Sequence, residues 1–128
     1  MKKNRISKNW INKQRRDIYV RQSKIEGYRS RAVYKLKEIN DKFKILRNGQ
    51  SIVDLGGAPG SWSQYLSSTL KNTKLLAIDL LEIQEIKNVK LMKGDFTDDI
   101  YKQKIKSFFN IKIDLVISDM AVNTTGNT

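Results

Sequence analysis

The segment Ile52–Trp62 constrains the fold most, because it joins an apolar run directly to a glycine-rich turn and then to a helix start. Gly56, Gly57 and Gly60 allow positive φ angles and a close approach of the backbone to a ligand. Pro59 stiffens the same turn. An ordinary strand-to-helix loop is the alternative, but this combination of strand, turn and helix favours a small-molecule pocket.

The glycine spacing limits which class of ligand the turn could bind. It differs from the dinucleotide pattern G-x-G-x-x-G, because Ala58 stands where the backbone would approach a pyrophosphate, and this disfavours nicotinamide and flavin cofactors. The next apolar run, Lys74–Asp79, ends in a carboxylate. In a Rossmann-like unit such a carboxylate contacts ribose hydroxyls, so we expect Asp79 to bind a nucleoside that lacks phosphates. S-adenosylmethionine fits this description.

Alternating strands and helices follow the turn. Apolar runs predict strands near 51–55, 74–79, 89–93 and 113–118, with helices near 62–71 and 98–109. Such crossovers indicate a parallel sheet covered on both faces, whose ligands lie outside the carboxyl ends of the strands. Asp119 closes the run Asp114–Ser118 at such an end, and we therefore expect it to face the same site as Gly56–Gly60.

The first fifty residues carry the positive charge. Of the formal net charge of +12, all lies in residues 1–50, which contain 16 Lys or Arg and 4 Asp or Glu, whereas residues 51–128 contain 9 of each. This asymmetry indicates a polyanion partner, either nucleic acid or an anionic membrane surface, although a solvated helix face is the alternative. Helices are expected over Trp10–Ile25 and Ser30–Leu46, the second with a buried stripe formed by Ala32, Leu36, Ile39 and Phe43.

Composition excludes several classes of function. The chain has no cysteine and no histidine, which rules out disulfides, thiolate zinc sites, cysteine nucleophiles and Ser-His-Asp triads, and we expect no metal site. Acid–base chemistry must therefore use Lys, Asp, Glu or Tyr. There is no run of 18 apolar residues and no secretion signal, so we expect a cytoplasmic protein without a membrane partner.

Five motifs in the same order resemble those of the FtsJ-type (RlmE-like) ribosomal RNA 2′-O-methyltransferases. They are Gly27-Tyr-Arg-Ser-Arg-Ala-Val-Tyr-Lys35, Asp54-Leu-Gly-Gly-Ala-Pro-Gly-Ser-Trp-Ser-Gln64, Ala77-Ile-Asp-Leu-Leu81, Gly94-Asp-Phe96 and Ser118-Asp-Met-Ala121. The resemblance implies methylation of a ribose in large-subunit (23S) ribosomal RNA, with uridine as the expected target and S-adenosylmethionine as the cofactor. It also implies that the RNA or the large ribosomal subunit is the partner.

The resemblance implies roles for individual residues. Asp95 is expected to meet the adenine edge with Phe96 beside the base, although a helix cap is the alternative for Asp95. Trp62 is expected either to wall the pocket or to anchor the core. The expected cofactor-binding set is Gly56, Gly60, Trp62, Asp79, Asp95, Phe96 and Asp119. The expected phosphate contacts are Arg15, Arg16, Arg21, Arg29 and Arg31.

The expected catalytic residues are Lys35 and Asp119. Lys35 lies at the border of the buried face of its helix, where a lysine lying along the surface is the alternative. The family's site resembles a Lys-Asp-Lys-Glu set in which the second lysine, on a later strand, is the base. Lys35 and Asp119 match the first two members, and residues up to Thr128 hold no match for the others.

We therefore expect an α/β Rossmann-like S-adenosylmethionine-dependent methyltransferase fold, truncated after the fourth parallel strand, with a basic N-terminal helical extension. Residues 1–50 are expected to form the RNA-binding extension, and residues 51–128 a partial methyltransferase domain. The alternative function is a catalytically incomplete module that binds RNA and S-adenosylmethionine.

Overall fold

The computed structural model describes residues 2–120, with side chains from residue 9 onward. Its helices are α1 (Lys2–Glu26), α2 (Val33–Phe43), α3 (Ser61–Thr69) and α4 (Asp99–Phe109). Its strands are β1 (Ser51–Leu55), β2 (Lys74–Asp79), β3 (Val89–Lys93) and β4 (Leu115–Ser118). Within these residues no helix is long and apolar enough to cross a membrane.

The four strands form one parallel sheet in the order β3-β2-β1-β4. The chain moves outward from β1 to β3 and then returns to pair β4 with the other side of β1. The winding direction therefore reverses between β1 and β4, and ligands of such sheets bind beyond the carboxyl ends at this point. The predicted α/β class with a parallel sheet is confirmed.

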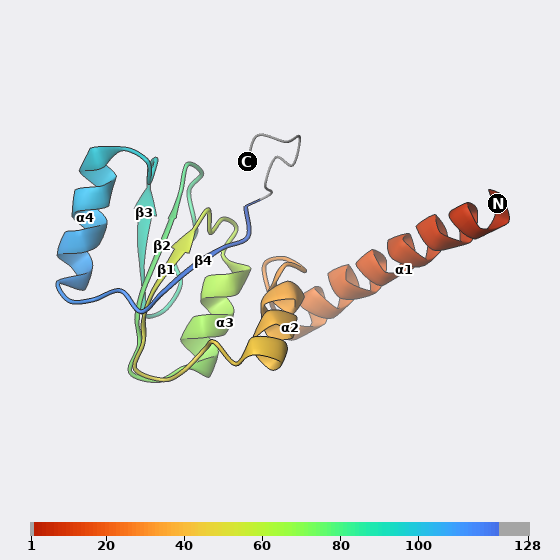
Figure 1. Cartoon of the computed structure of the whole chain (residues 1–128), viewed down its shortest axis with the longest axis horizontal. Helices are drawn as coiled ribbons and strands as arrows, with labels where there is room; N and C mark the ends of the chain where they lie inside the picture. The colour runs from red at the N-terminus through yellow and green to blue at the C-terminus, as the bar shows by residue number, and fades with distance from the viewer. Residues whose placement is uncertain (1, 121–128) are drawn as a thin grey trace.

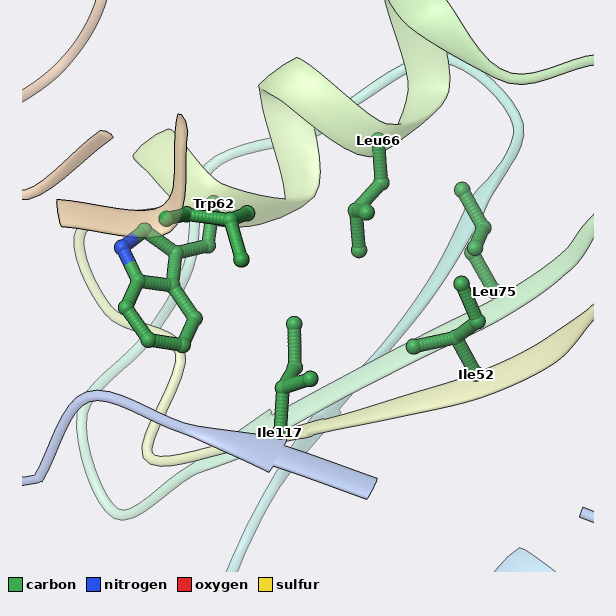
Figure 2. Packing of buried hydrophobic residues seen from close by; sticks show 6 residues of the cluster. Ile52, Trp62, Leu66, Leu75 and Ile117 are labelled. Atoms are coloured by element: carbon green, nitrogen blue, oxygen red, sulfur yellow. The ribbon is translucent and has the colours of Figure 1, made fainter. Parts of the chain in front are cut away.

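Helices cover both faces of the sheet (Figure 1). On one face, Figure 2 shows Trp62 and Leu66 of α3 pointing toward Ile52, Leu75 and Ile117 of the strands. Leu36 of α2 belongs to the same cluster, so α2 shares the core of the sheet. On the other face, the strands pack against α4 through the buried residues Val53, Leu76, Ile78, Ile105 and Phe109. The part of the basic extension that projects away from the core is α1 (Figure 1).

The first two helices differ from their predicted bounds by several residues, whereas α3, α4 and β4 lie within two residues of theirs. The helix predicted over Trp10–Ile25 begins at Lys2, because no glycine or proline interrupts the chain before Gly27. The helix predicted over Ser30–Leu46 is the shorter α2. Lys44 adopts a left-handed conformation at its end, and Oδ1 of Asn40 accepts a 2.9 Å hydrogen bond from Leu46 N, which draws the chain out of the helix.

The predicted buried stripe of this helix is wrong at one position. Leu36 is fully buried, but Phe43 is 63% exposed, because α2 ends beside it and no element of the described chain covers the ring. Val33 and Tyr34 are buried in its place. Burial therefore follows the contacts at the start of α2 and not the whole predicted stripe.

Candidate active site

The glycine turn lies at the carboxyl end of β1 and is held by β2. Gly56 and Gly60 adopt φ angles of +70° and +118°, which side chains rarely allow. The carbonyl of Ile78 accepts hydrogen bonds from the amides of Gly56 and Gly57. A Cβ atom at Gly57 would lie 3.0 Å from Oδ2 of Asp54, so the backbone passes close to that carboxylate.

The carboxylate of Asp79 holds the same turn. Its Oδ2 accepts a 3.0 Å hydrogen bond from the amide of Ala58, and its Oδ1 accepts a 2.8 Å bond from the amide of Leu81. Each carboxylate oxygen has a second lone pair, so both retain acceptor capacity. Asp79 therefore fixes the turn from the next strand, and its ribose contact stays a prediction.

Asp54 is a buried carboxylate beneath the turn. It is 2% exposed, and its Oδ2 accepts a 2.8 Å hydrogen bond from the hydroxyl of Ser63. Its Oδ1 is buried without a hydrogen-bond partner among the described residues. Burial raises the pKa of Asp54 to about 7; the Ser63 hydrogen bond opposes this rise, and the nearby charges of Asp119 and Asp79 add to it.

A cavity of about 70 Å³ brings several of these groups together. Its walls include Asp54, the glycine turn, Trp62 and Asp119. Trp62 is only 5% exposed and donates a 2.7 Å hydrogen bond from Nε1 to the carbonyl of Ala32. Trp62 thus anchors the core and also lines this cavity, so the two roles considered for it from the sequence are compatible.

Lys35 and Asp119 meet beside this cavity. Nζ of Lys35 lies 3.5 Å from Oδ1 of Asp119, although the two residues are 84 positions apart. Both line a larger cavity of about 550 Å³, which also includes Tyr19 of α1 and Arg31. The Lys35 side chain is 63% exposed, so its ammonium is accessible from this cavity.

Asp95 and Phe96 lie beyond the carboxyl end of β3. Oδ1 of Asp95 accepts hydrogen bonds from the amide and the hydroxyl of Thr97, at 2.9 and 2.6 Å, and these bonds lower its pKa. The cap of α4 is instead Asp98, whose side chain accepts from the amide of Ile100. Phe96 packs against the cluster beneath α4. Their contacts with adenine stay predictions.

Comparison with known proteins identifies relatives of this chain. A family model described as FtsJ-like methyltransferase matches residues 28–128. The chain belongs to this family. It is 64% identical over 126 residues to the ribosomal RNA large subunit methyltransferase E of Pelagibacter ubique, an alignment that covers 98% of this chain and 62% of that protein. With the protein of the same name from Legionella pneumophila (strain Corby), it is 42% identical over 130 residues, which cover 100% of this chain and 63% of the relative.

A solved structure agrees with this membership. The crystal structure of a ribosomal RNA methyltransferase from Plasmodium falciparum superposes with a TM-score of 0.67 and 35% identity, covering 78% of this chain and 60% of that one. The chain therefore spans about three fifths of the length of these FtsJ-like relatives. The resemblance and the Rossmann-like methyltransferase fold predicted from the motifs are both confirmed.

The arginines expected to contact phosphate fall into two groups. Arg15, Arg16, Arg21 and Arg31 are exposed. Arg29 instead donates from Nη1 to the carbonyls of Pro59 and Gln84, at 3.0 and 2.7 Å, and from Nη2 to that of Glu85 at 2.7 Å. Three of its five N–H donors are therefore engaged within the FtsJ-like fold. Arg29 thus holds the chain around the glycine turn, and its expected phosphate contact stays a prediction.

Sequence reasoning also missed functional candidates in this FtsJ-like domain. The motifs gave Asp54 no role of its own, although a carboxylate inside the apolar run Ile52–Leu55 was the available signal. Nothing local in the sequence indicated that Tyr19 would stack on Tyr34, with ring centroids 5.1 Å apart. This contact brings α1 to the wall of the 550 Å³ cavity that Lys35 and Asp119 line, named here the Lys35 cavity.

Proposed function

We infer that this chain supplies the cofactor pocket and much of the RNA surface of a methyltransferase acting on a ribose 2′-hydroxyl of large-subunit (23S) ribosomal RNA, with a uridine as target. One observation carries this proposal. Lys35 and Asp119 come from elements 84 positions apart and meet at a cavity that adjoins the glycine turn. A methyl acceptor bound in the larger cavity would face a methyl donor held at that turn.

The residues around the small cavity fit S-adenosylmethionine. This cofactor carries positive charge on its sulfonium and on its ammonium group. The buried Oδ1 of Asp54 has no partner among the residues described, and a cation placed beside it would stabilise the ionised carboxylate. The glycine turn would admit the methionine portion, Asp79 the ribose, and Asp95 with Phe96 the adenine.

When bound, S-adenosylmethionine would supply an activated methyl group, and the sulfur would leave as a neutral thioether as the bond from the methyl carbon to the sulfur breaks. The exposed ammonium of Lys35 has three donors, and Asp119 takes one of them. The remaining donors are available to hold an oxygen of the target nucleotide at the cavity. Asp119 thereby orients Lys35 toward the ribose hydroxyl, whose proton must pass to a base. The resemblance assigns this base to a second lysine, which has no match in residues 1–128.

The basic extension supports the RNA part of the proposal. Four of the arginines expected to contact phosphate lie on α1 or at the larger cavity, namely Arg15, Arg16, Arg21 and Arg31. Exposed apolar side chains share α1 with them, among them Trp10, which is 59% exposed and offers a face for base stacking. Action on ribosomal RNA places the proposed activity in the cytoplasm.

A chimera tests this function. In it, the present chain replaces the matched part of the Pelagibacter ubique relative, and labelled S-adenosylmethionine is supplied with unmethylated large-subunit RNA. We expect methyl transfer that makes one phosphodiester bond resistant to alkali, as modification of a 2′-hydroxyl requires, and that is lost in Asp119→Ala. Transfer to a base, or a folded chimera that binds both substrates and transfers nothing, would contradict the proposal.

A further inference from the structure

A second basic surface lies at the outer edge of the sheet. A groove of about 730 Å³ runs between the outer strand β3 and α4. Its lining includes Lys90 of β3, Lys93 at the carboxyl end of the same strand, and Tyr101, Lys104 and Phe108 from one face of α4. Lys93 pairs in register with Asp79, so this end of the groove adjoins the expected cofactor site. Figure 1 shows β3 and α4 at the end of the molecule opposite the projecting part of α1.

The groove continues along the sheet edge. A neighbouring cavity of about 470 Å³ shares Lys90 and Phe108 with it and adds Lys74, Lys87 and the single carboxylate Glu85. The two cavities together, named here the β3–α4 groove, thus carry five lysines and one acidic residue. The ion pairs within the described residues are Lys35–Asp119 and Lys37–Glu26, so no described carboxylate forms an ion pair with these lysines.

This concentration of charge is hidden in the sequence totals. Residues 51–128 are formally neutral, but their carboxylates include Asp54, Asp79 and Asp119 at the carboxyl ends of the strands. The lysines gather instead at the edge formed by β3 and α4. The neutral total therefore conceals an uneven distribution, in which five of the nine lysines of residues 51–128 line one groove.

Protection of a sheet edge is the alternative explanation. Lysines on an outer strand discourage pairing with another chain, and this accounts for Lys90 and Lys93. It does not account for Lys104, which lies on α4 with its Nζ 4.9 Å from the centroid of the Tyr101 ring. Nor does it account for Lys74 of β2, whose Nζ lies 4.8 Å from the centroid of the Phe108 ring. Cations and aromatic faces from three elements converge on one groove.

We propose that the β3–α4 groove binds the phosphate backbone of the substrate RNA, outside the cavity that Lys35 and Asp119 line. The proposal rests on the proposed function and extends it. Uncompensated lysines supply counterion release, and the rings of Tyr101 and Phe108 offer surfaces for unpaired bases. Because α1 and this groove lie at opposite ends of the molecule, an RNA that contacts both must span its long axis (Figure 1).

The experiment compares two triple variants of the full chain. The groove variant is Lys87→Gln, Lys90→Gln and Lys104→Gln. The matched control is Lys102→Gln, Lys106→Gln and Lys112→Gln, which removes the same charge from exposed lysines that do not line the groove. Affinity for large-subunit ribosomal RNA is measured by filter binding across a salt series, and calorimetry with S-adenosylmethionine verifies that each variant retains a folded pocket.

We expect the groove variant to lower the magnitude of the salt slope by about 2 to 3, because each lost phosphate contact removes about 0.7 to 0.9. The control should leave the slope within experimental error of the unchanged chain. Equal losses in both variants would show that only net charge matters and would overturn the proposal. An unchanged slope in the groove variant would also overturn it, and self-association of that variant would then identify the lysines as edge protection.

The experiment gives a different result if the proposed function itself is wrong. If the unchanged chain does not bind the RNA at all, both the proposed function and the groove assignment fall. If the unchanged chain binds and the groove variant behaves like the control, the groove assignment falls alone.

Discussion

Ser63 donates a 2.8 Å hydrogen bond to one oxygen of Asp54, whereas the other oxygen of the same carboxylate is buried without a partner in the described chain. The carboxylate lies directly beneath the glycine turn, and its burial opposes its ionisation. Such a group destabilises the fold when charged and is suited to receive a cation.

The first prediction concerns stability against pH. The pKa of Asp54 is raised to about 7 from an ordinary value of 3.8, so between these values the folded state binds more protons than the unfolded state. The contribution of Asp54 to the free energy of unfolding should therefore fall as pH rises from about 4 to about 7 and stay low above that. The difference is on the order of 4 kcal/mol.

Asp54→Asn should remove this decline, because the amide cannot ionise and still accepts from Ser63. Denaturant unfolding at pH 5 and pH 8 measures the effect as a gain in stability that is clearly larger at pH 8 than at pH 5. A gain of equal size at both pH values would contradict the assigned pKa.

The second prediction links Asp54 to cofactor binding. A cation beside its carboxylate would lower the pKa of Asp54, so S-adenosylmethionine should release a proton on binding near pH 7. Calorimetry in buffers of different ionisation enthalpy measures this release. Asp54→Asn should bind more weakly and release no proton, although it is folded. Release of the same number of protons by Asp54→Asn would mean that a group other than Asp54 loses its proton when the cofactor binds.

The third prediction separates two neighbouring arginines. Arg29→Ala should lower the free energy of unfolding by about 2–4 kcal/mol, because three backbone carbonyls lose a charged donor. Arg31→Ala is the matched control: it should leave stability nearly unchanged and weaken RNA binding, since Arg31 is exposed at the Lys35 cavity. Thermal unfolding and filter binding of both variants test the assignment. It fails if Arg29→Ala is as stable as the unchanged chain.

The fourth prediction concerns α1. Replacing Arg15, Arg16 and Arg21 by glutamine in the full chain should reduce the salt slope of RNA binding by about 2 to 3. These side chains are exposed, so the change should leave the unfolding transition in place. Truncation at Gln50 is a poorer test, because it would remove Leu36 from the core. An unaltered slope in a folded triple variant would show that these arginines of α1 do not contact the RNA.

The fifth prediction concerns turnover. A positioned base accelerates such a reaction roughly 10²–10⁴-fold, and the lysine that the resemblance assigns to this role has no match in residues 1–128. The 128-residue chain alone should therefore transfer methyl groups far more slowly than the chimera, and behave mainly as a module that binds RNA and cofactor. Labelled methyl incorporation measures the difference. Robust transfer that Lys35→Ala abolishes would show that Lys35 itself serves as the base.

Much of the fold was predictable because its signals are local. The strands at 51–55, 74–79 and 89–93 were predicted with the bounds of β1, β2 and β3, since short apolar runs between turn residues indicate buried parallel strands. The glycine turn was predictable for the same reason, because positive φ angles at Gly56 and Gly60 depend on the absence of a side chain. The family was predictable as well, because each of its five motifs is a short run of consecutive residues.

The roles of individual charged residues were decided by tertiary structure. Arg29 resembled its exposed neighbours in sequence, but carbonyls from 30 to 56 positions away occupy three of its five donors. Phe43 followed the helical spacing of a buried stripe and is exposed because α2 ends beside it.

The sequence by itself determined the order of the strands and helices along the chain, the position of the glycine turn and the family. Each of these depends on residues that are neighbours along the chain. Tertiary structure alone decided that Asp54 is buried with one oxygen unpartnered among the described residues, that Lys35 meets Asp119, and that lysines from three elements share the β3–α4 groove. Burial and electrostatic interaction depend on distances in space, and residues far apart in sequence set those distances only when the sheet is assembled.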